Sequence, residues 1–358
     1  MPDSKTTEDS VRLAFVQQAS SCRELGSPFT SSLCALAAER LTGDHPVGAK
    51  ILSWSGDPSP GGDSVPLRLA GALHALVLSG SDKQLASVYP PQTAEADDLW
   101  SAIEQACRIH ASFILDRLTS APQTNEVRRS GALLPGFLTI SSLLQKPLVL
   151  SEVGASAGLN LQWDRYEYWL GDRTWALQPS PVLIAPEWRG PPPPLDTPVH
   201  VDSRAGCDLN PLNPASEADA LRLLSYIWAD QQDRLERTRF ALAIAATNRQ
   251  TVDRADAVDW LEKRLQEVHE DQVHVVYHTI AWQYLPAHSK AEGEALIAAA
   301  GERATESAPL ARLQMEADDQ KHSAALTLQV WPSGEKHLIG RADFHGRWVE
   351  WIGWPGAH

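Results

Sequence analysis

The stretch from Pro147 to Leu161, PLVLSEVGASAGLNL, constrains the fold more than any other part of the chain. An apolar run is followed by Glu152 and then by a turn of small residues that contains Gly154 and Gly158. A short run rich in Val and Leu is typical of a buried parallel strand. The glycines allow a sharp reversal of the backbone and a close approach to a bound nucleotide. The stretch therefore predicts a strand, a tight turn and the start of a helix.

The same turn also spells G-x-S-x-G, with Ser156 at its centre. That pattern surrounds the nucleophile of many serine hydrolases, where the serine sits on a sharp turn between strand and helix. Taken alone, the letters are compatible with a nucleotide-binding turn and with a nucleophile elbow.

Composition narrows the choice of function. With 358 residues, 43% of them hydrophobic, the chain can bury a large core, and its length predicts about two domains. A net charge of -14 disfavours nucleic-acid binding, because phosphate neutralisation requires clustered Lys and Arg. A small-molecule or protein substrate is therefore favoured over nucleic acid, and of these we expect a small molecule. The first ten residues carry no signal pattern and no window reaches the roughly 20 apolar residues of a membrane span, so we expect a cytoplasmic protein without a membrane segment.

Cysteine and histidine spacings indicate no metal site. The cysteines lie far apart without paired spacing, which argues against a zinc knuckle or a disulfide scaffold and predicts four buried thiols: Cys22, Cys34, Cys107 and Cys207. His274 and His278 alternate along a β-branched and aromatic run. They are expected on one face of a strand rather than as a metal-binding pair on a helix.

Helix signals dominate before residue 120. Apolar periodicity and glycine stops predict helices from residue 10 to Gly26, through residues 33–41, over 65–78 and along 94–118. We take residues 1–121 as a helical N-terminal region on the substrate side. Residues 122–358 are expected to form the cofactor-binding domain, with an insertion around 163–198.

Strands and helices alternate after residue 147. Residues 159–171 are expected to be a helix, and a second strand from His200 to Cys207 ends at Asp208. Further strands are predicted over QVHVVYHT and PLARLQMEA, and two more flank the turn WPSGEK. The expected fold class is α/β: a Rossmann-like, mainly parallel sheet with a C-terminal antiparallel hairpin and a helical N-terminal region.

Two groups of side chains have both a structural and a functional interpretation. Asn125, Glu126 and Arg128 precede the first strand, where they suit either a helix cap or a ligand-binding loop. Asp256 precedes a helix, where an acid interacts favourably with the helix dipole, and it also suits a position beside an adenine ring.

Several blocks of the sequence carry a family resemblance. LSEVGASAGLNLQWDRYEYWLG, with PQTNEVRRS before it and GCDLNP, YHTIAWQYLP and ADFHGRWVEW after it, resembles an uncharacterised bacterial family, domain of unknown function 2332, over nearly the whole chain. From residue 147 onward, the order of elements is similar to that of class I methyltransferases that use S-adenosylmethionine.

The methyltransferase resemblance implies a cofactor site. The acid and turn after the first strand would bind the cofactor through Glu152, Gly154, Ser156, Gly158 and Asn160. Asp208 matches the acid that binds the ribose, and Asp256 matches the adenine-side residue. Two features depart from the pattern: Ser156 replaces a common glycine, and Asp208 lies beyond the roughly 20-residue interval expected after such a turn. The insertion around 163–198 would explain the longer interval.

Methyl transfer requires alignment of an acceptor and, where needed, removal of a proton, because the sulfonium already activates the methyl group. His278 and His345 are the candidate bases, since histidine changes charge near neutral pH, and Tyr284 is a further catalytic candidate. Tyr166 and Trp282 are expected to bind substrate; with Tyr284 they would form an aromatic wall, although core packing explains them equally well.

Two other functions stay open. A serine esterase of the α/β-hydrolase type would use Ser156, with Asp256 or Asp343 and with His278 or His345. The helical character of the first 146 residues and the terminal hairpin favour the methyltransferase over this alternative. The third possibility is a protein that binds a nucleotide without catalysing a reaction.

Overall fold

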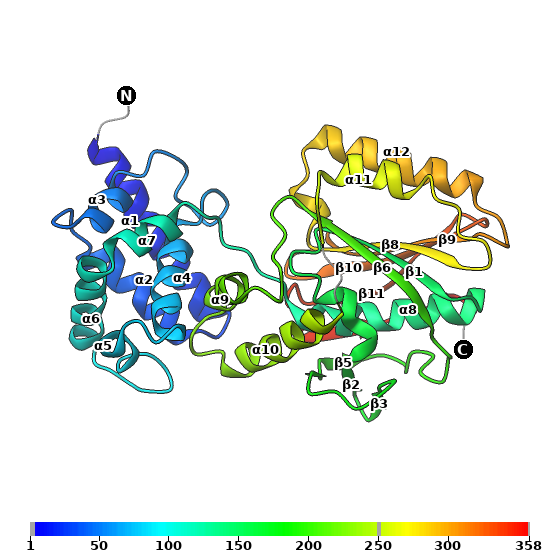
Figure 1. The fold of residues 1–358 in the computed structure, drawn as a ribbon, viewed down its shortest axis with the longest axis horizontal. Helices are drawn as coiled ribbons and strands as arrows, with labels where there is room; N and C mark the ends of the chain where they lie inside the picture. The colour runs from blue at the N-terminus through cyan, green and yellow to red at the C-terminus, as the bar shows by residue number, and fades with distance from the viewer. Residues whose placement is uncertain (1–3, 249–251, 357–358) are drawn as a thin grey trace. The chain divides into compact units, whose positions relative to one another are not determined.

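The chain folds into two compact units in a computed structural model that describes residues 4–248 and 252–356 (Figure 1). Unit 1 comprises residues 1–124 and 217–236, and unit 2 comprises residues 125–216 and 237–358. Both units are therefore built from two separate parts of the chain.

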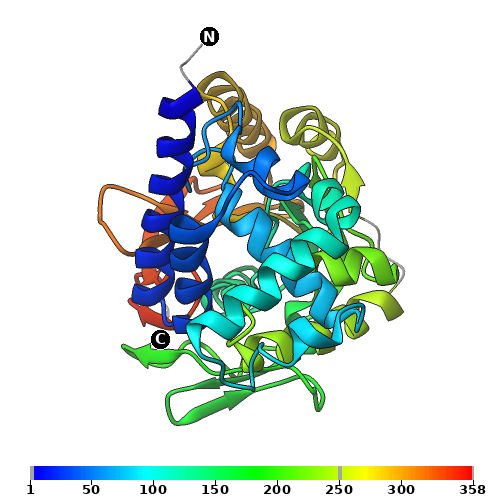
Figure 2. The ribbon, with the colours of Figure 1, turned by 90° about the vertical axis from the view of Figure 1, so that its left-hand side faces the viewer.

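Unit 1 is helical. Its elements are α1 (Ser4–Glu24), α2 (Pro28–Arg40), α3 (Pro46–Leu52), α4 (Val65–Leu78), α5 (Lys83–Ala86), α6 (Ala96–Ile109), α7 (Ala111–Leu118) and α9 (Glu217–Ser225). The helices α1 and α2 run side by side (Figure 2). The single helix expected along 94–118 is wrong, because His110 has φ -105° and ψ 27° and separates α6 from α7. No described helix is long and apolar enough to cross a bilayer.

Two helix N-termini and the environment of the cysteines follow from the local sequence. Pro28 and Pro46 occupy the first turns of α2 and α3, where the missing amide hydrogen has no intrahelical partner to lose. All four cysteines are buried free thiols, as predicted.

Unit 2 contains a nine-stranded sheet in the order β5-β12-β11-β10-β9-β8-β1-β6-β7 among the described residues. The strands are β1 (Leu148–Val153), β5 (Glu187–Arg189), β6 (Val201–Asp208), β7 (Asp253–Arg254), β8 (Val273–Thr279), β9 (Leu310–Ala317), β10 (Ala324–Trp331), β11 (Glu335–Ala342) and β12 (Trp348–Trp351). The neighbours β7, β6, β1, β8 and β9 are parallel, whereas β9 to β12 pair antiparallel. The expected α/β class, with a mostly parallel central sheet and a C-terminal hairpin, is confirmed.

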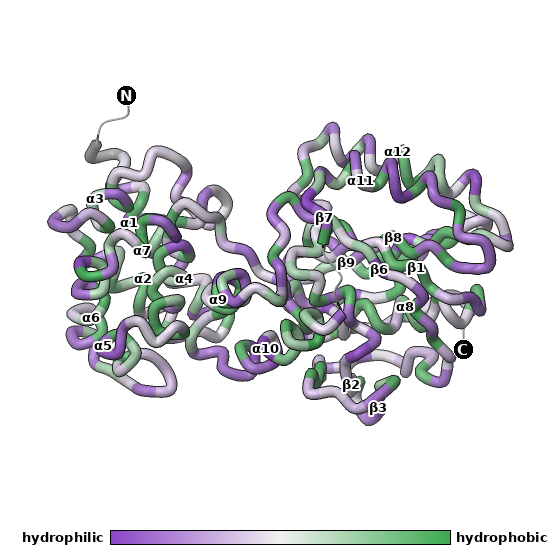
Figure 3. The backbone as a smooth tube through the Cα atoms, viewed as in Figure 1, coloured by the Kyte–Doolittle hydropathy of each residue, from purple (hydrophilic) through white to green (hydrophobic). Residues whose placement is uncertain are grey.

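Helices cover both faces of this sheet. Figure 1 shows α8 (Ser130–Leu144) on one face, and α11 (Ala257–Arg264) and α12 (Ala287–Arg303) together on the other. Hydrophilic and hydrophobic residues alternate along α12 (Figure 3), whereas every residue of β1 and β8 is buried. The remaining helix, α10 (Gln232–Thr247), includes the boundary between the two units at residue 236.

The helix expected over residues 159–171 is wrong. A 3₁₀ helix, η2 (Asn160–Arg165), is followed by a three-stranded sheet of β2 (Glu167–Leu170), β3 (Arg173–Trp175) and β4 (Leu183–Ile184). Tyr166, Tyr168 and Leu170 are buried while Trp169 is exposed, which is the period of two of a strand. The aromatic residues favour a strand, and Gly171, at φ +68°, makes the turn to β3.

Candidate functional site at the carboxyl ends of the parallel strands

The parallel strands end at one edge of the sheet, and β1 lies where the strand order reverses. From β1 the chain continues to β6 and β7 on one side and then to β8 and β9 on the other. Open α/β sheets bind ligands at such a point, outside the carboxyl ends of the strands. The loops after β1, β6, β7 and β8 therefore form the candidate site.

The turn after β1 has a left-handed backbone at three positions. Gly154, Ser156 and Gly158 have φ values of +73°, +55° and +70°. A Cβ atom on Gly154 would lie 2.5 Å from the Cβ atom of Ala281, in the loop after β8. Glycine is thus required at residue 154 both by the backbone angle and by this close approach.

Side chains from two other segments hold this turn. The Ser156 amide donates to Asp208 Oδ2 at 3.0 Å, and Asp208 Oδ1 accepts from the Asn210 amide at 2.8 Å. On the other side, Asn125 Oδ1 accepts from the amides of Ala157 and Leu159 at 3.2 and 3.0 Å. The structure thus brings together Asn125, Ser156 and Asp208, which were selected from three distant parts of the sequence.

Glu152 lies beneath the turn with only 1% of its surface exposed. The Tyr277 hydroxyl donates to Glu152 Oε2 at 3.3 Å and is also 3.4 Å from the Asn160 carbonyl oxygen. Burial raises the pKa of Glu152 to about 8, although the Tyr277 hydrogen bond lowers it; Asp208 raises it further and Arg129 lowers it. A carboxyl group with this pKa is mostly protonated at neutral pH.

Asp256 follows β7, next to the strand that ends in Asp208. Its Oδ1 accepts from the Val258 amide at 2.8 Å, so it is the N-cap of α11. The pairing of Asp208 with Arg254 places the ends of β6 and β7 side by side. The helix-cap interpretation of Asp256 is therefore confirmed, and the same residue lies at the site edge.

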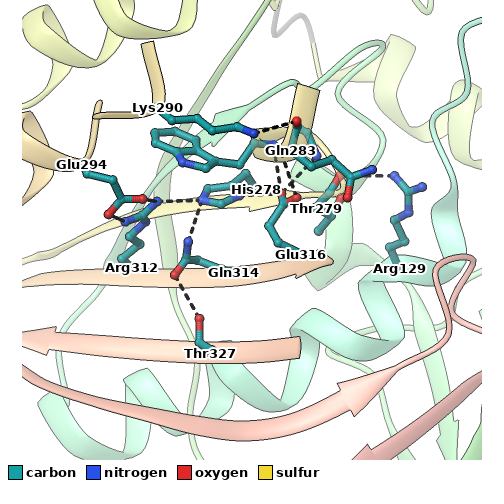
Figure 4. A network of polar contacts seen from close by, with 12 residues as sticks. Arg129, His278, Thr279, Gln283, Lys290, Glu294, Arg312, Gln314, Glu316 and Thr327 are labelled. Atoms are coloured by element: carbon teal, nitrogen blue, oxygen red, sulfur yellow. Dashed lines mark hydrogen bonds and ion pairs between the residues drawn. The ribbon is translucent and has the colours of Figure 1, made fainter. Parts of the chain in front are cut away.

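His278 is fully buried within a polar network (Figure 4). Its Nδ1 lies 2.7 Å from Glu316 Oε1, and its Nε2 lies 3.3 Å from Arg312 Nη2 and 3.2 Å from Gln314 Nε2. A guanidinium and an amide nitrogen can only donate, so Nε2 accepts and the proton resides on Nδ1. Burial lowers the pKa of His278, opposed by the Glu316 hydrogen bond, and favours this neutral form.

Glu316 holds the loop after β8. Besides His278, it accepts from the amides of Ala281 at 3.0 Å, Trp282 at 3.1 Å and Gln283 at 3.4 Å. Burial alone would raise the pKa of Glu316, but these hydrogen bonds and His278 keep it below its usual range. The Trp282 ring stacks on His278 at 4.7 Å between centroids. Both nitrogens of His278 are thus engaged, Nδ1 with Glu316 and Nε2 with Arg312 and Gln314 of β9, which favours a positioning role over proton transfer.

The remaining candidates occupy different environments. Tyr166 is fully buried and its hydroxyl donates to the Leu159 carbonyl at 2.6 Å, whereas Tyr284 is 75% exposed. Glu126 is buried and accepts from the Arg128 amide at 3.1 Å and from Arg128 Nε at 3.4 Å. Tyr166 is therefore a core residue that supports η2.

His345 lies in the loop after β11. Because β11 is parallel to β9, this loop is at the same edge as the ends of β1 and β8. The His345 amide donates to Asp343 Oδ1 at 3.0 Å, and its side chain is partly exposed.

Sequence reasoning missed Arg129 and Glu316. Arg129 joins the loops after β8 and β11, since its Nε donates to the Phe344 carbonyl at 2.9 Å and its Nη1 to the Thr279 carbonyl at 3.3 Å. The alternation of Arg312, Gln314 and Glu316 along β9 was the available signal, because three polar side chains on one face of an internal strand require partners. Over the ranges that the structure covers, no group of three or more His, Cys, Asp or Glu side chains is placed to hold a metal ion.

Comparison with known proteins identifies the family. The model of the family described as "Uncharacterized protein conserved in bacteria (DUF2332)" matches residues 12–351. No curated protein and no solved structure matches the chain. The match covers most of the helical unit, the turn after β1 and the C-terminal strands, and the chain belongs to the DUF2332 family of bacterial proteins.

Proposed function

We propose that this protein is an S-adenosylmethionine-dependent methyltransferase that acts on a small molecule. The observation that carries the proposal is the placement of three acids at the ends of three adjacent parallel strands. Glu152 is the last but one residue of β1, Asp208 is the last residue of β6, and Asp256 follows β7 by two residues; the left-handed turn lies beside the first two. This is the arrangement with which Rossmann-like proteins bind a nucleoside.

The strand order supports a Rossmann-like site. When the parallel strands β1, β6, β7, β8 and β9 are numbered in chain order, this part of the sheet reads 3-2-1-4-5, which is the order of the first five strands of a Rossmann sheet. The antiparallel β10 and β11 that follow are the terminal hairpin on which the resemblance to class I methyltransferases rests.

The turn favours S-adenosylmethionine over a dinucleotide. Dinucleotide sites place the pyrophosphate at the N-terminus of a helix that follows the glycine turn. Here the turn leads into η2, six residues in 3₁₀ conformation, and then into β2. S-adenosylmethionine carries adenosine but no phosphate, so it does not need that helix.

Each acid then has a role. Asp208 would bind the ribose hydroxyls, Asp256 would lie beside the adenine, and Glu152 would face the methionine part. When bound, the cofactor supplies the activated methyl group. The protein itself would hold the loop after β8 against the acceptor through Glu316 and His278. Where the acceptor must lose a proton, His345 is better placed than His278 to accept it.

The serine esterase is the second candidate because Ser156 has the left-handed φ of a strained elbow. A triad requires the serine hydroxyl to meet a histidine. Ser156 Oγ is buried and makes no hydrogen bond in the part of the chain that the structure covers. This observation favours the methyltransferase.

Calorimetry with S-adenosylmethionine and S-adenosylhomocysteine tests the proposal. We expect both to bind, and Asp208→Asn to weaken binding about 10- to 100-fold, since hydrogen bonds to a charged group contribute about 1.5–3 kcal/mol. Asp202→Asn is the matched control, because Asp202 is exposed on the same strand, six residues before Asp208.

Absence of binding to the folded protein, together with labelling of Ser156 by a fluorophosphonate, would replace the proposal with the esterase. Binding without methyl transfer to any of a panel of small molecules would favour the non-catalytic nucleotide-binding protein.

A further inference from the structure

Unit 2 buries four carboxyl groups among its described residues: Glu126, Glu152, Asp164 and Asp343. Three of them have charged or multiple partners. Asp164 accepts two hydrogen bonds from Arg204, at 2.6 and 2.9 Å. Asp343 accepts two from the Arg347 side chain, at 3.0 and 2.7 Å, and Glu126 interacts with Arg128 as described above. The fold therefore supplies a cation to nearly every acid that it buries.

Glu152 is the exception. Within the described part of the chain it forms no ion pair, and its hydrogen bond from Tyr277 is long, at 3.3 Å. A buried carboxylate without a cation is costly, and such a group either stays protonated or acquires a partner.

The groups that face Glu152 come from each element around it. Tyr277 on β8 supplies the hydroxyl, with Phe137 of α8 packed edge-on against its ring. Asp208 on β6 adds negative charge, and Tyr166 after η2 is also within electrostatic range. Arg129 is the cation that acts on Glu152, but its guanidinium donates to the carbonyl oxygens of the loops after β8 and β11.

We propose that Glu152 is a specificity-determining residue that admits ligands bringing a positive charge to the end of β1, and that it releases its proton when such a ligand binds. The inference rests on the proposed function, which places the sulfonium and ammonium groups of S-adenosylmethionine in this region. The step breaks the carboxyl O–H bond and passes the proton to solvent, and the ligand's cation then neutralises the carboxylate. A neutral nucleoside such as adenosine has no cation to pair with the carboxylate, so its binding does not favour release of the proton.

Proton release can be counted by calorimetry. S-adenosylmethionine is titrated into the full chain at pH 6.5 in buffers of different ionisation enthalpy, and the dependence of the binding enthalpy on buffer gives the protons released. At this pH the ligand's own amino group stays protonated, since α-amino groups titrate near 8. We expect close to one proton released per site, and an affinity that rises up to about tenfold per pH unit between pH 6 and 7.

Two variants and a second ligand sharpen the test. Glu152→Gln keeps the shape of the neutral carboxyl; we expect it to bind S-adenosylmethionine more than tenfold more weakly at pH 7, with no proton release and no pH slope. Asp202→Asn should behave as wild type. Adenosine should bind both wild type and Glu152→Gln with equal affinity and without proton release.

The outcomes separate this inference from the proposed function. Tight binding of S-adenosylmethionine by wild type without proton release, or release that persists in Glu152→Gln, overturns the role of Glu152 and leaves the methyltransferase proposal intact. Failure of wild type to bind S-adenosylmethionine at any pH overturns both.

Discussion

At the scale of single residues, the two buried titratable groups of the candidate site, His278 and Glu152, differ in how well their polar atoms are hydrogen-bonded. His278 has a partner on both ring nitrogens, whereas Glu152 has, among the residues that the structure describes, one long hydrogen bond. The first arrangement stabilises the loop after β8, and the second leaves a buried carboxyl group without a charged hydrogen-bond partner among the described residues. A stability measurement distinguishes them, because only an uncompensated group lowers the stability of the ligand-free protein.

Glu152→Gln should therefore stabilise the ligand-free chain at neutral and alkaline pH. The pKa of Glu152 is raised in the folded state to about 8. The stability that the protonated group contributes is thus fully present below its unfolded pKa, near 4.3, and is lost as the pH rises towards 8. Urea unfolding should show equal stability at pH 4.5 and an advantage of a few kcal/mol for the variant at pH 8. Equal stability at pH 8 would mean that the carboxylate is compensated in the folded protein.

His274 should make stability fall in acid. It is 5% exposed, its Nε2 lies 2.8 Å from Ser151 Oγ, and burial first, then His269 and Arg264, lower its pKa to about 3. Because the pKa of His274 is lower in the folded state, its contribution to stability is present above the unfolded-state pKa of about 6.5. That contribution is lost as the pH falls, by up to about 1.4 kcal/mol per pH unit.

Urea unfolding of His274→Gln between pH 6.5 and 5 should show a shallower loss of stability than wild type. The exposed His288→Gln is the control and should retain the wild-type slope. An unchanged slope in His274→Gln would contradict the assignment.

At the scale of elements, the strands were predictable and the crossover between β1 and β6 was not. The strands β1 and β8 were predicted from apolar or β-branched runs, β6 from an extended stretch that ends in an acid, and β9 from its place after a predicted helix, and most of these are local signals. The run from Gly158 to Gly171 also contains strand-like alternation, but its charged and aromatic residues fit a helical pattern equally well. Contacts with other segments decide between helix and strand: Phe137 of α8 stacks on Trp163 at 4.3 Å between ring centroids, and β4 pairs with β2.

The turn after β1 gives a prediction at this scale. Gly154 and Gly171 have similar φ values of +73° and +68°, but only at Gly154 would a Cβ atom collide, at 2.5 Å, with Ala281; at Gly171 the nearest atom is 3.7 Å away. Gly171→Ala should cost about 1–2 kcal/mol from backbone strain alone. Gly154→Ala should cost at least about 1 kcal/mol more, as found for overpacked sites, and should weaken S-adenosylmethionine binding. Equal unfolding midpoints for the two variants would contradict the close packing of the two loops.

At the scale of the whole molecule, each unit is assembled from two separate stretches of chain. Residues 217–236 complete unit 1, where the Tyr226 ring lies so close to Gly71 that a Cβ atom there would be 2.6 Å from it. Asp230 in this segment accepts from Ser27 Oγ at 2.6 Å and from the Phe29 amide at 2.9 Å, at the start of α2.

Asp230→Ala should destabilise unit 1 by about 1–2 kcal/mol, because it removes a carboxylate from the N-terminus of a helix and leaves an amide without its acceptor. Thermal unfolding followed by circular dichroism measures the loss. Glu236→Ala, an exposed acid of the same segment, should leave the midpoint unchanged. A similar midpoint for Asp230→Ala would show that the late segment does not cap α2.

The sequence by itself determined the α/β class, the positions of the main strands, the family and the acids at the strand ends. These follow from periodicity, glycine and short motifs, which are properties of neighbouring residues. Only the tertiary structure decided which hydrogen-bond partners each candidate site residue has. Glu152 meets Tyr277 across 125 residues and His278 meets Glu316 across 38. Whether a buried polar group finds a partner depends on the register of strands that the sequence does not place side by side.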